Sequence, residues 1–384
     1  MTRRWGAARS ALLLAALLPA ACMRTFEFDP PGGGGGTSGG DAGPGGGGNG
    51  VDGGNSDGSH LHCTGGASPT SLTVEQEVPS IMFVLDRSPS MLKNVAPTSS
   101  SRFLVAGSAI TDTVHNYSQV AQFGYVEFPG LPSGDNSCPQ SGCCAGGTVP
   151  VAPTGSSGGI VSAISMRLMA CTNNSQNNCA FTDATPTGQA LKKVVNAITG
   201  KWLYAVLLTD GGPSPNCVLS SSSPDVCVET QQQISSMSNE SSPTPISTFV
   251  VGVGDSISPN DEDCLGGMAT AGGHSTGTAP FYIVANTEAL VRSQVDAIVA
   301  STICNVDVID SFDTSRPIEV DFNNAAIPND PTKTNGWDLD RNKSRITFYG
   351  PACTTLIQEL KTTPKRVVVK ACVDPSHAFQ QPAP

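Results

Sequence analysis

Residues Ser80–Met91 read SIMFVLDRSPSM, and this stretch decides the fold. Five consecutive apolar residues follow Ser80 and run directly into the polar sequence DRSPS. An unbroken apolar run of this length, bounded by turn residues, is typical of a strand buried on both faces of a parallel sheet. Asp86, Ser88 and Ser90 then bring three oxygen-bearing side chains to the end of that strand. Open α/β sheets bind ligands at this edge, outside the carboxyl ends of the strands.

Runs of strand length alternate with segments of helical spacing over the following 200 residues. Strands are expected at 81–85, 120–128, 203–208, 246–253 and 281–285, with a short edge strand at 148–152, and helices at 103–117, 158–171, 188–199, 226–239, 261–271 and 287–300. Strands joined by helices form a parallel sheet covered on both faces. The sequence therefore predicts an α/β domain with a doubly wound, mostly parallel sheet.

Two later segments carry oxygen-bearing side chains at comparable places. Thr185 in TPTGQAL precedes a predicted helix, and Asp210 in LYAVLLTDGG follows a predicted strand. Together with Asp86-x-Ser88-x-Ser90, they resemble the metal-ion-dependent adhesion site (MIDAS) of von Willebrand factor type A (VWA) domains. The three pieces occur in the family's order, and the resemblance covers residues 79–301.

The resemblance implies a role for each residue. Ser88, Ser90 and Thr185 would contact a divalent cation directly, whereas Asp86 and Asp210 would act mainly through water and orient the other groups. Oxygen ligands suit a hard cation, so Mg²⁺ is expected, with Mn²⁺ or Ca²⁺ as alternatives. With uncharged hydroxyls as its closest protein ligands, the ion would keep most of its charge and attract an Asp or Glu carboxylate of a partner.

Each of these residues also has an ordinary structural explanation. Ser88 and Ser90 are good N-caps for a following helix. Thr185 precedes a Pro, which is a favoured first helical residue, and Thr187 is a rival for its role. Asp210 begins an Asp-Gly-Gly sequence typical of a turn. Because all five oxygens would meet at one edge of one sheet, a shared metal site is the favoured interpretation.

The N-terminus has the features of a targeting segment. Arg3 and Arg4 precede an apolar stretch that is too short to span a bilayer. Residues 1–22 end in LPAAC, which resembles a bacterial lipobox with Cys22 as the lipidated residue. Pro19 departs from the usual Leu of that motif, so a plain secretory signal is the alternative. We therefore expect an exported protein of the bacterial cell envelope, an outer-membrane lipoprotein or otherwise secreted, that meets the membrane only through a lipid anchor.

The cysteine content agrees with export. The chain has 13 Cys, and lipidation of Cys22 would leave an even number for disulfides in an oxidising compartment. Local bridges between Cys217 and Cys227 and between Cys171 and Cys179 are compatible with the spacing. Spacing alone does not fix the connectivity.

The remaining sequence predicts a tether and a second module. Residues 30–59 are rich in Gly and almost free of apolar side chains, so the segment 23–62 is expected to form a flexible tether. Residues 63–302 would form the VWA-like domain. Residues 303–384 contain short β-branched runs and one short helix, which predict a small β-rich module tied by Cys304, Cys353 and Cys372.

The composition and the motifs argue against some classes of function. The net charge of −11 argues against a nucleic-acid partner, which needs a basic footprint. A hydrolase is disfavoured because no His accompanies the two Ser residues as a base. The sequence thus predicts a non-enzymatic binding or adhesion protein that holds a protein or surface ligand through a cation. The alternative is an assembly subunit of an envelope complex whose VWA-like domain packs constitutively and without metal.

Overall fold

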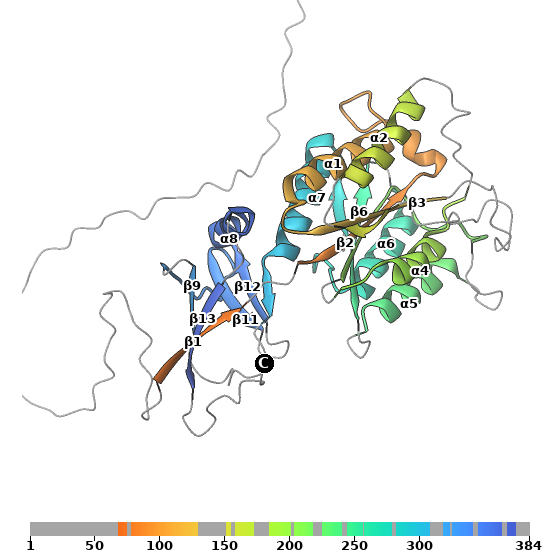
Figure 1. Ribbon diagram of the computed structural model, residues 1–384. Coiled ribbons are helices and arrows are strands. Elements are labelled where there is room, and N and C mark those ends of the chain that lie inside the picture. The colour runs from red at the N-terminus through yellow and green to blue at the C-terminus, as the bar shows by residue number, and fades with distance from the viewer. Residues whose placement is uncertain are drawn as a thin grey trace, which may run out of the picture. The chain divides into compact units, whose positions relative to one another are not determined.

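The computed structural model describes residues of both the predicted α/β domain and the predicted C-terminal module (Figure 1). The described ranges are 68–74, 78–129, 151–154, 158–172, 184–200, 203–217, 225–239, 244–255, 257–278, 282–307, 318–322, 325–340, 345–362 and 367–373. The predicted lipidation site Cys22 and the predicted tether lie outside the described residues. Within these ranges, no helix combines the length and the apolar character that crossing a bilayer requires.

A six-stranded sheet forms the centre of the α/β domain (Figure 1). Its strands are β2 (Ser80–Asp86), β3 (Gln122–Phe128), β4 (Val151–Thr154), β5 (Leu203–Thr209), β6 (Ile246–Val253) and β7 (Ile283–Ala285). They lie in the order β4-β3-β2-β5-β6-β7. All neighbours are parallel except the edge strand β4, which is antiparallel to β3. The predicted edge strand is therefore present, and it begins three residues later than expected.

Helices cover both faces of this sheet, as Figure 1 shows. They are α1 (Arg102–Tyr117), α2 (Gly158–Thr172), α4 (Thr187–Ala197), α5 (Val226–Met237), α6 (Pro259–Ala271) and α7 (Glu288–Ile303). Apolar side chains of α1, α2 and α7 belong to one buried cluster, and those of α4, α5 and α6 to another. The predicted doubly wound α/β fold is thus confirmed.

Strand β2 shows why an unbroken apolar run is required at the centre. Ile81, Phe83 and Leu85 pack into the cluster on the α1 side, whereas Met82 and Val84 pack into the cluster on the α4 side. Successive side chains of a strand point to opposite faces, so a strand covered on both sides needs apolar residues at every position. All five side chains are fully buried.

The strand order places a crevice beside β2. The chain proceeds from β2 outward to β3 and β4, and then returns to begin β5 on the other side of β2. The order therefore reverses between β2 and β5, and ligands of open α/β sheets bind at such a reversal, outside the carboxyl ends of the strands. Asp86 ends β2, and Asp210 directly follows β5.

The C-terminal segment forms a β-rich module, as expected. One sheet has the order β1-β13-β9-β10 and a second the order β11-β12-β8, and one helix, α8, accompanies them. Their bounds are β1 (Ser68–Val74), β8 (Asn305–Asp307), β9 (Ile318–Phe322), β10 (Ala325–Ile327), β11 (Gly336–Asp340), β12 (Arg345–Tyr349), α8 (Gly350–Thr362) and β13 (Val367–Val373). Strand β1 pairs antiparallel with β13 over seven residues. Residues 68–74 fall within the range 63–302 predicted for the VWA-like domain, but they pair with the C-terminal strand β13.

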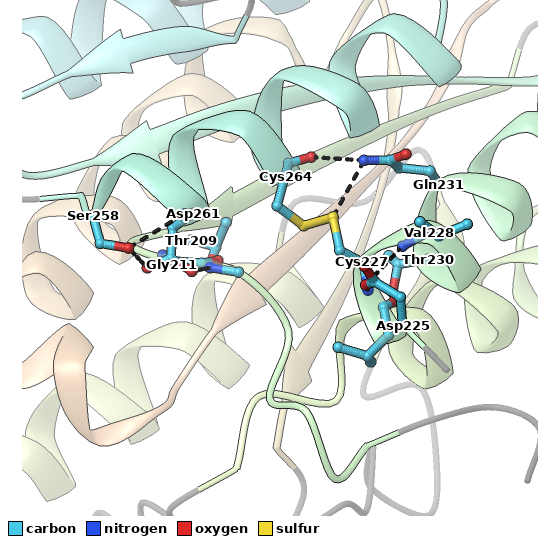
Figure 2. Close-up of a disulfide and its surroundings, with 12 residues drawn as sticks. Thr209, Gly211, Asp225, Cys227, Val228, Thr230, Gln231, Ser258, Asp261 and Cys264 are labelled. Carbon is cyan, nitrogen blue, oxygen red and sulfur yellow. Dashed lines mark hydrogen bonds between the residues drawn. A yellow bond between two sulfur atoms is a disulfide. The ribbon is translucent and has the colours of Figure 1, made fainter. Parts of the chain in front are cut away.

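Disulfides correct one prediction and support another. Cys227 at the start of α5 bonds to Cys264 in α6 rather than to Cys217 (Figure 2). The predicted local bridge between Cys217 and Cys227 is therefore wrong, because α5 and α6 lie side by side and bring together residues 37 positions apart. In the C-terminal segment, Cys304 bonds to Cys353, which are two of the three cysteines predicted to tie that module.

Candidate metal centre

Four of the five predicted site residues form one hydrogen-bonded chain at the crevice. The backbone N–H of Ser88 donates to Oδ1 of Asp86 at 2.7 Å. The hydroxyl oxygens of Ser88 and Ser90 lie 2.9 Å apart, and the Ser90 hydroxyl donates to Oδ1 of Asp210 at 2.7 Å. Residues 120 positions apart in the sequence thus meet at the ends of neighbouring strands.

The two serines do not serve as the helix caps that were considered as the alternative. Ser88 precedes a 3₁₀ turn, Pro89–Leu92, and within the described residues its side chain makes no capping hydrogen bond to that turn. Helix α1 is capped instead by Ser101, whose hydroxyl accepts from the Leu104 N–H. The Ser88 and Ser90 hydroxyls therefore point along the crevice, where they contact each other and Asp210.

Asp86 is the most deeply buried member of the site. Its exposed fraction is 0%, and burial raises its carboxyl pKa to about 7, with a further upward contribution from the charge of Asp210. Hydrogen bonds from the Thr209 hydroxyl and from Ser88 act in the opposite direction. The Thr209 hydroxyl donates to Oδ2 of Asp86 at 2.6 Å. The hydrogen bonds that Asp86 accepts therefore do not fully offset the cost of burying its charge, and a nearby cation would stabilise the carboxylate.

Thr185 is attached through its backbone to the loop that follows Asp210. Its N–H donates to the Ser214 hydroxyl at 2.7 Å, and its carbonyl accepts from the Ser214 N–H at 3.1 Å. Ser214 lies four residues beyond Asp210 in the loop after β5. Helix α4 begins at Thr187, and among the described residues no side-chain hydrogen bond caps it. The cap function considered for Thr185 is therefore not realised.

Thr187 remains a rival donor. It is 1% exposed, and its hydroxyl oxygen has no hydrogen-bond partner among the described residues. Buried hydroxyls are nearly always satisfied, so an orphaned one calls for a group that the protein itself does not supply. An ion or its bound water would satisfy it. Both threonines of the TPT sequence therefore remain candidate donors.

Further contacts fix the Asp210 loop in place. The buried Arg102 donates from Nη1 to Oδ2 of Asp210 at 2.5 Å. Asp261, near the start of α6, accepts from the Gly212 N–H at 2.9 Å and from the Ser258 hydroxyl at 2.6 Å. Figure 2 shows Ser258 and Asp261 beside Thr209 and Gly211. Both oxygens of Asp210 are thus engaged, one by Ser90 and one by Arg102.

A second buried arginine supports the other side of the site. Arg87 is 0% exposed, and it donates to Oε1 of Glu127 at 3.2 Å and to the carbonyl oxygen of Pro129 at 2.8 Å. Its backbone N–H donates to the carbonyl oxygen of Phe128. These contacts attach the turn after β2 to the end of β3, so that Asp86 and Ser88 project from a fixed backbone.

The donor set fits a hard divalent cation. Carboxylate and hydroxyl oxygens of Asp86, Ser88, Ser90 and Asp210 converge on one crevice, and they include the desolvated carboxylate of Asp86. Oxygen-only ligand sets favour Mg²⁺, Mn²⁺ or Ca²⁺ over softer metals. The described ranges contain no group of three or more His, Cys, Asp or Glu residues able to hold a metal. Any metal here would therefore depend on hydroxyl donors.

Sequence reasoning missed three contributors to this site. Thr209, Arg102 and Asp261 contact Asp86, Asp210 and the glycine turn, respectively. The position of Thr209 immediately before Asp210 is a local signal that could have found it. Arg102 and Asp261 carry no such signal, because each lies at or near the start of a helix outside the motif.

No protein-family model matches the chain, and no curated protein matches it. Solved structures do match. The pilus adhesin SpaC from Lactobacillus rhamnosus GG aligns with a TM-score of 0.43 and 13% identity, over 79% of this chain and 41% of SpaC. Proximal thread matrix protein 1 from the mussel byssus aligns with a TM-score of 0.37 and 15% identity, over 62% of this chain and 51% of that protein.

A manganese-loaded TRAP protein from Plasmodium vivax aligns with a TM-score of 0.36 and 12% identity, over 62% of this chain and 78% of that protein. The chain spans less than two thirds of SpaC and of the byssus protein. Similarities this low do not identify what the chain binds.

Proposed function

We propose that this chain is an exported binding protein that holds a protein or surface ligand through a divalent cation at the crevice between β2 and β5. The observation that carries the proposal is the hydrogen-bonded chain from Asp86 through Ser88 and Ser90 to Asp210. Four oxygen-bearing side chains converge from two neighbouring strand ends, at the point where the strand order reverses.

The chemistry of the donors supports recognition of an acidic group. Ser88, Ser90 and one of the two threonines would hold the ion through uncharged oxygens, while Asp86 and Asp210 orient them and balance part of the charge. Mg²⁺ prefers six oxygen ligands and usually keeps several waters. A carboxylate of the partner would replace one of those waters, because the ion supplies a positive charge that the neutral hydroxyls do not cancel.

A binding role is proposed in preference to catalysis. The two histidines within the described residues are engaged elsewhere: His115 contacts the carbonyl oxygen of Thr111 in its own helix, and the His274 ring stacks on Phe249 with centroids 3.6 Å apart. Neither contact offers Ser88 or Ser90 a general base, which a serine nucleophile needs.

Metal titration of the purified chain tests the proposal. Isothermal calorimetry with Mn²⁺ and with Mg²⁺ should show one saturable site in the wild type. The site should disappear in Asp86→Ala and weaken at least about tenfold in Ser90→Ala, because a metal ligand or its orienting partner is typically worth 10–100-fold in affinity. Ser293→Ala is the matched control, since the Ser293 hydroxyl bonds only within α7 on an exposed surface. Its affinity should equal that of the wild type.

Capture from an envelope extract then tests the partner chemistry. Immobilised wild-type protein should retain its partner in Mg²⁺ and release it on addition of EDTA, whereas Asp86→Ala should retain little under either condition. A partner that stays bound in EDTA, with circular dichroism unchanged, would favour the metal-independent assembly role instead.

A further inference from the structure

Arg102 is a buried cation placed directly against the candidate metal centre. It is the first residue of α1, and its exposed fraction is 2%. Its guanidinium donates from Nη1 to Oδ2 of Asp210 at 2.5 Å and from Nη2 to Oδ1 of Asp255 at 3.5 Å. Asp255 follows β6, so the guanidinium connects the ends of two neighbouring strands.

The backbone is shaped to admit this side chain. Gly254 has φ +112°, a conformation that L side chains rarely adopt, and a Cβ at that position would collide with the Arg102 guanidinium. Glycine is therefore required at this position both by the backbone angle and by the close approach of the arginine. Placing Arg102 here therefore requires a residue with a left-handed backbone conformation at the edge of the sheet.

Stability alone does not account for Arg102. Its Nε has no hydrogen-bond partner among the described residues, although it is buried. Replacing a buried ion pair with apolar residues of similar volume is often neutral or stabilising, so such pairs are weak contributors to folding. An incompletely satisfied buried arginine that contacts a predicted metal-site carboxylate points to a role in the site itself.

We propose that Arg102 is a positioning residue that sets the charge of the metal centre. By engaging Oδ2 of Asp210 it neutralises that carboxylate and leaves only Oδ1 directed to Ser90. Asp86 is then the one buried carboxylate in the site without a cationic partner, so a bound divalent ion keeps a net positive charge. This inference rests on the proposed function and gives a reason why the site would recognise an acidic ligand.

Two opposite outcomes distinguish this role from a purely structural one. If Arg102 sets the charge, Arg102→Gln removes a positive charge from the site and should raise the affinity for Mn²⁺ alone by about tenfold, as Coulomb's law at short range predicts for a partly buried charge. If Arg102 only holds Asp210 in place, its loss should weaken Mn²⁺ binding. Isothermal calorimetry with Mn²⁺ measures both directions.

The stability of the metal-free protein provides a second readout. In EDTA, Arg102→Gln should unfold at a lower urea concentration than the wild type, because the Asp210 carboxylate loses its cation. Saturating Mn²⁺ should restore more stability to Arg102→Gln than to the wild type, since tighter binding to the folded state stabilises it further. Arg292→Gln is the control, because Arg292 pairs with Glu288 and Asp112 on the surface. It should leave the Mn²⁺ affinity unchanged.

Different experimental results would overturn the role of Arg102 and the proposed metal-dependent function. A wild type that binds no Mn²⁺ overturns both. A wild type that binds Mn²⁺, with Arg102→Gln equal to it or weaker, overturns the role of Arg102 alone. If Arg102→Gln does not fold, Arg102→Met removes the same charge while keeping an unbranched side chain in the buried space. That variant should also bind Mn²⁺ more tightly than the wild type, and weaker or equal binding would overturn the inference.

Discussion

Asp86 is subject to opposing requirements in the metal-free protein. Folding buries it, which favours the neutral acid, whereas cation binding needs the carboxylate. Its pKa rises from 3.8 to about 7 on folding. Between these values the folded protein retains a proton that the unfolded chain has lost, so this residue makes the folded state less stable as the pH rises from about 4 to about 7.

The first prediction concerns Asp86→Asn in EDTA. The variant should gain urea stability relative to the wild type as the pH rises from about 4 to about 7, and the difference should stay constant above about pH 7. Adding Mg²⁺ at pH 8 should stabilise the wild type and leave Asp86→Asn unaffected. A difference between the two proteins that does not change with pH would show that Asp86 ionises normally in the folded state.

The second prediction concerns the buried pair between Arg87 and Glu127. Glu127→Gln removes the carboxylate that pairs with the buried Arg87 guanidinium, and breaking such a pair costs about 3–5 kcal/mol in the free energy of unfolding. Glu288→Gln removes one of the two carboxylate partners of the solvent-accessible Arg292 and should cost less than about 1 kcal/mol. Urea unfolding of both variants makes the comparison, and equal losses would contradict the structural role assigned to Arg87.

At the scale of elements, the central strands were predictable and the long-range links were not. An apolar run such as residues 81–85 predicts a central strand without further information, because only a strand covered on both faces needs apolar residues at every position. The four hydrogen-bonded site residues were also predictable, since Asp86 and Asp210 end neighbouring strands. The partner of Cys227 was not, because it depends on how α5 and α6 pack side by side and not on proximity in sequence.

The third prediction tests that link between helices. The disulfide between Cys227 and Cys264 closes a loop of 37 residues, which is worth about 4 kcal/mol in the chain-entropy model. The double variant Cys227→Ser, Cys264→Ser should lose most of this in urea unfolding. Each single variant should lose at least as much and also show a free thiol. An unchanged urea midpoint in the double variant would mean that packing between α5 and α6 alone holds the helices together.

At the scale of the whole chain, the described residues do not divide at a single sequence boundary. Strand β1 precedes the α/β domain in sequence but pairs with β13, close to the C-terminus. No local pattern reveals this, because a short strand carries no information about its partner. The predicted division between residues 302 and 303 therefore separates β1 from the strand it pairs with.

The fourth prediction follows from this pairing. Replacing residues 68–74 with a Gly-Ser sequence of equal length removes β1 while keeping chain length and all cysteines. Seven paired residues are lost, and at a net 0.5–1.5 kcal/mol per hydrogen bond the cost should be about 3 kcal/mol or more. Strand β13 would then become an exposed edge, which promotes association between chains. Urea unfolding and size-exclusion chromatography should thus show lower stability and larger species.

The same replacement at residues 41–47, within the predicted tether, should change neither the stability nor the size of the species. If the two variants behave alike, β1 does not hold the C-terminal sheet together.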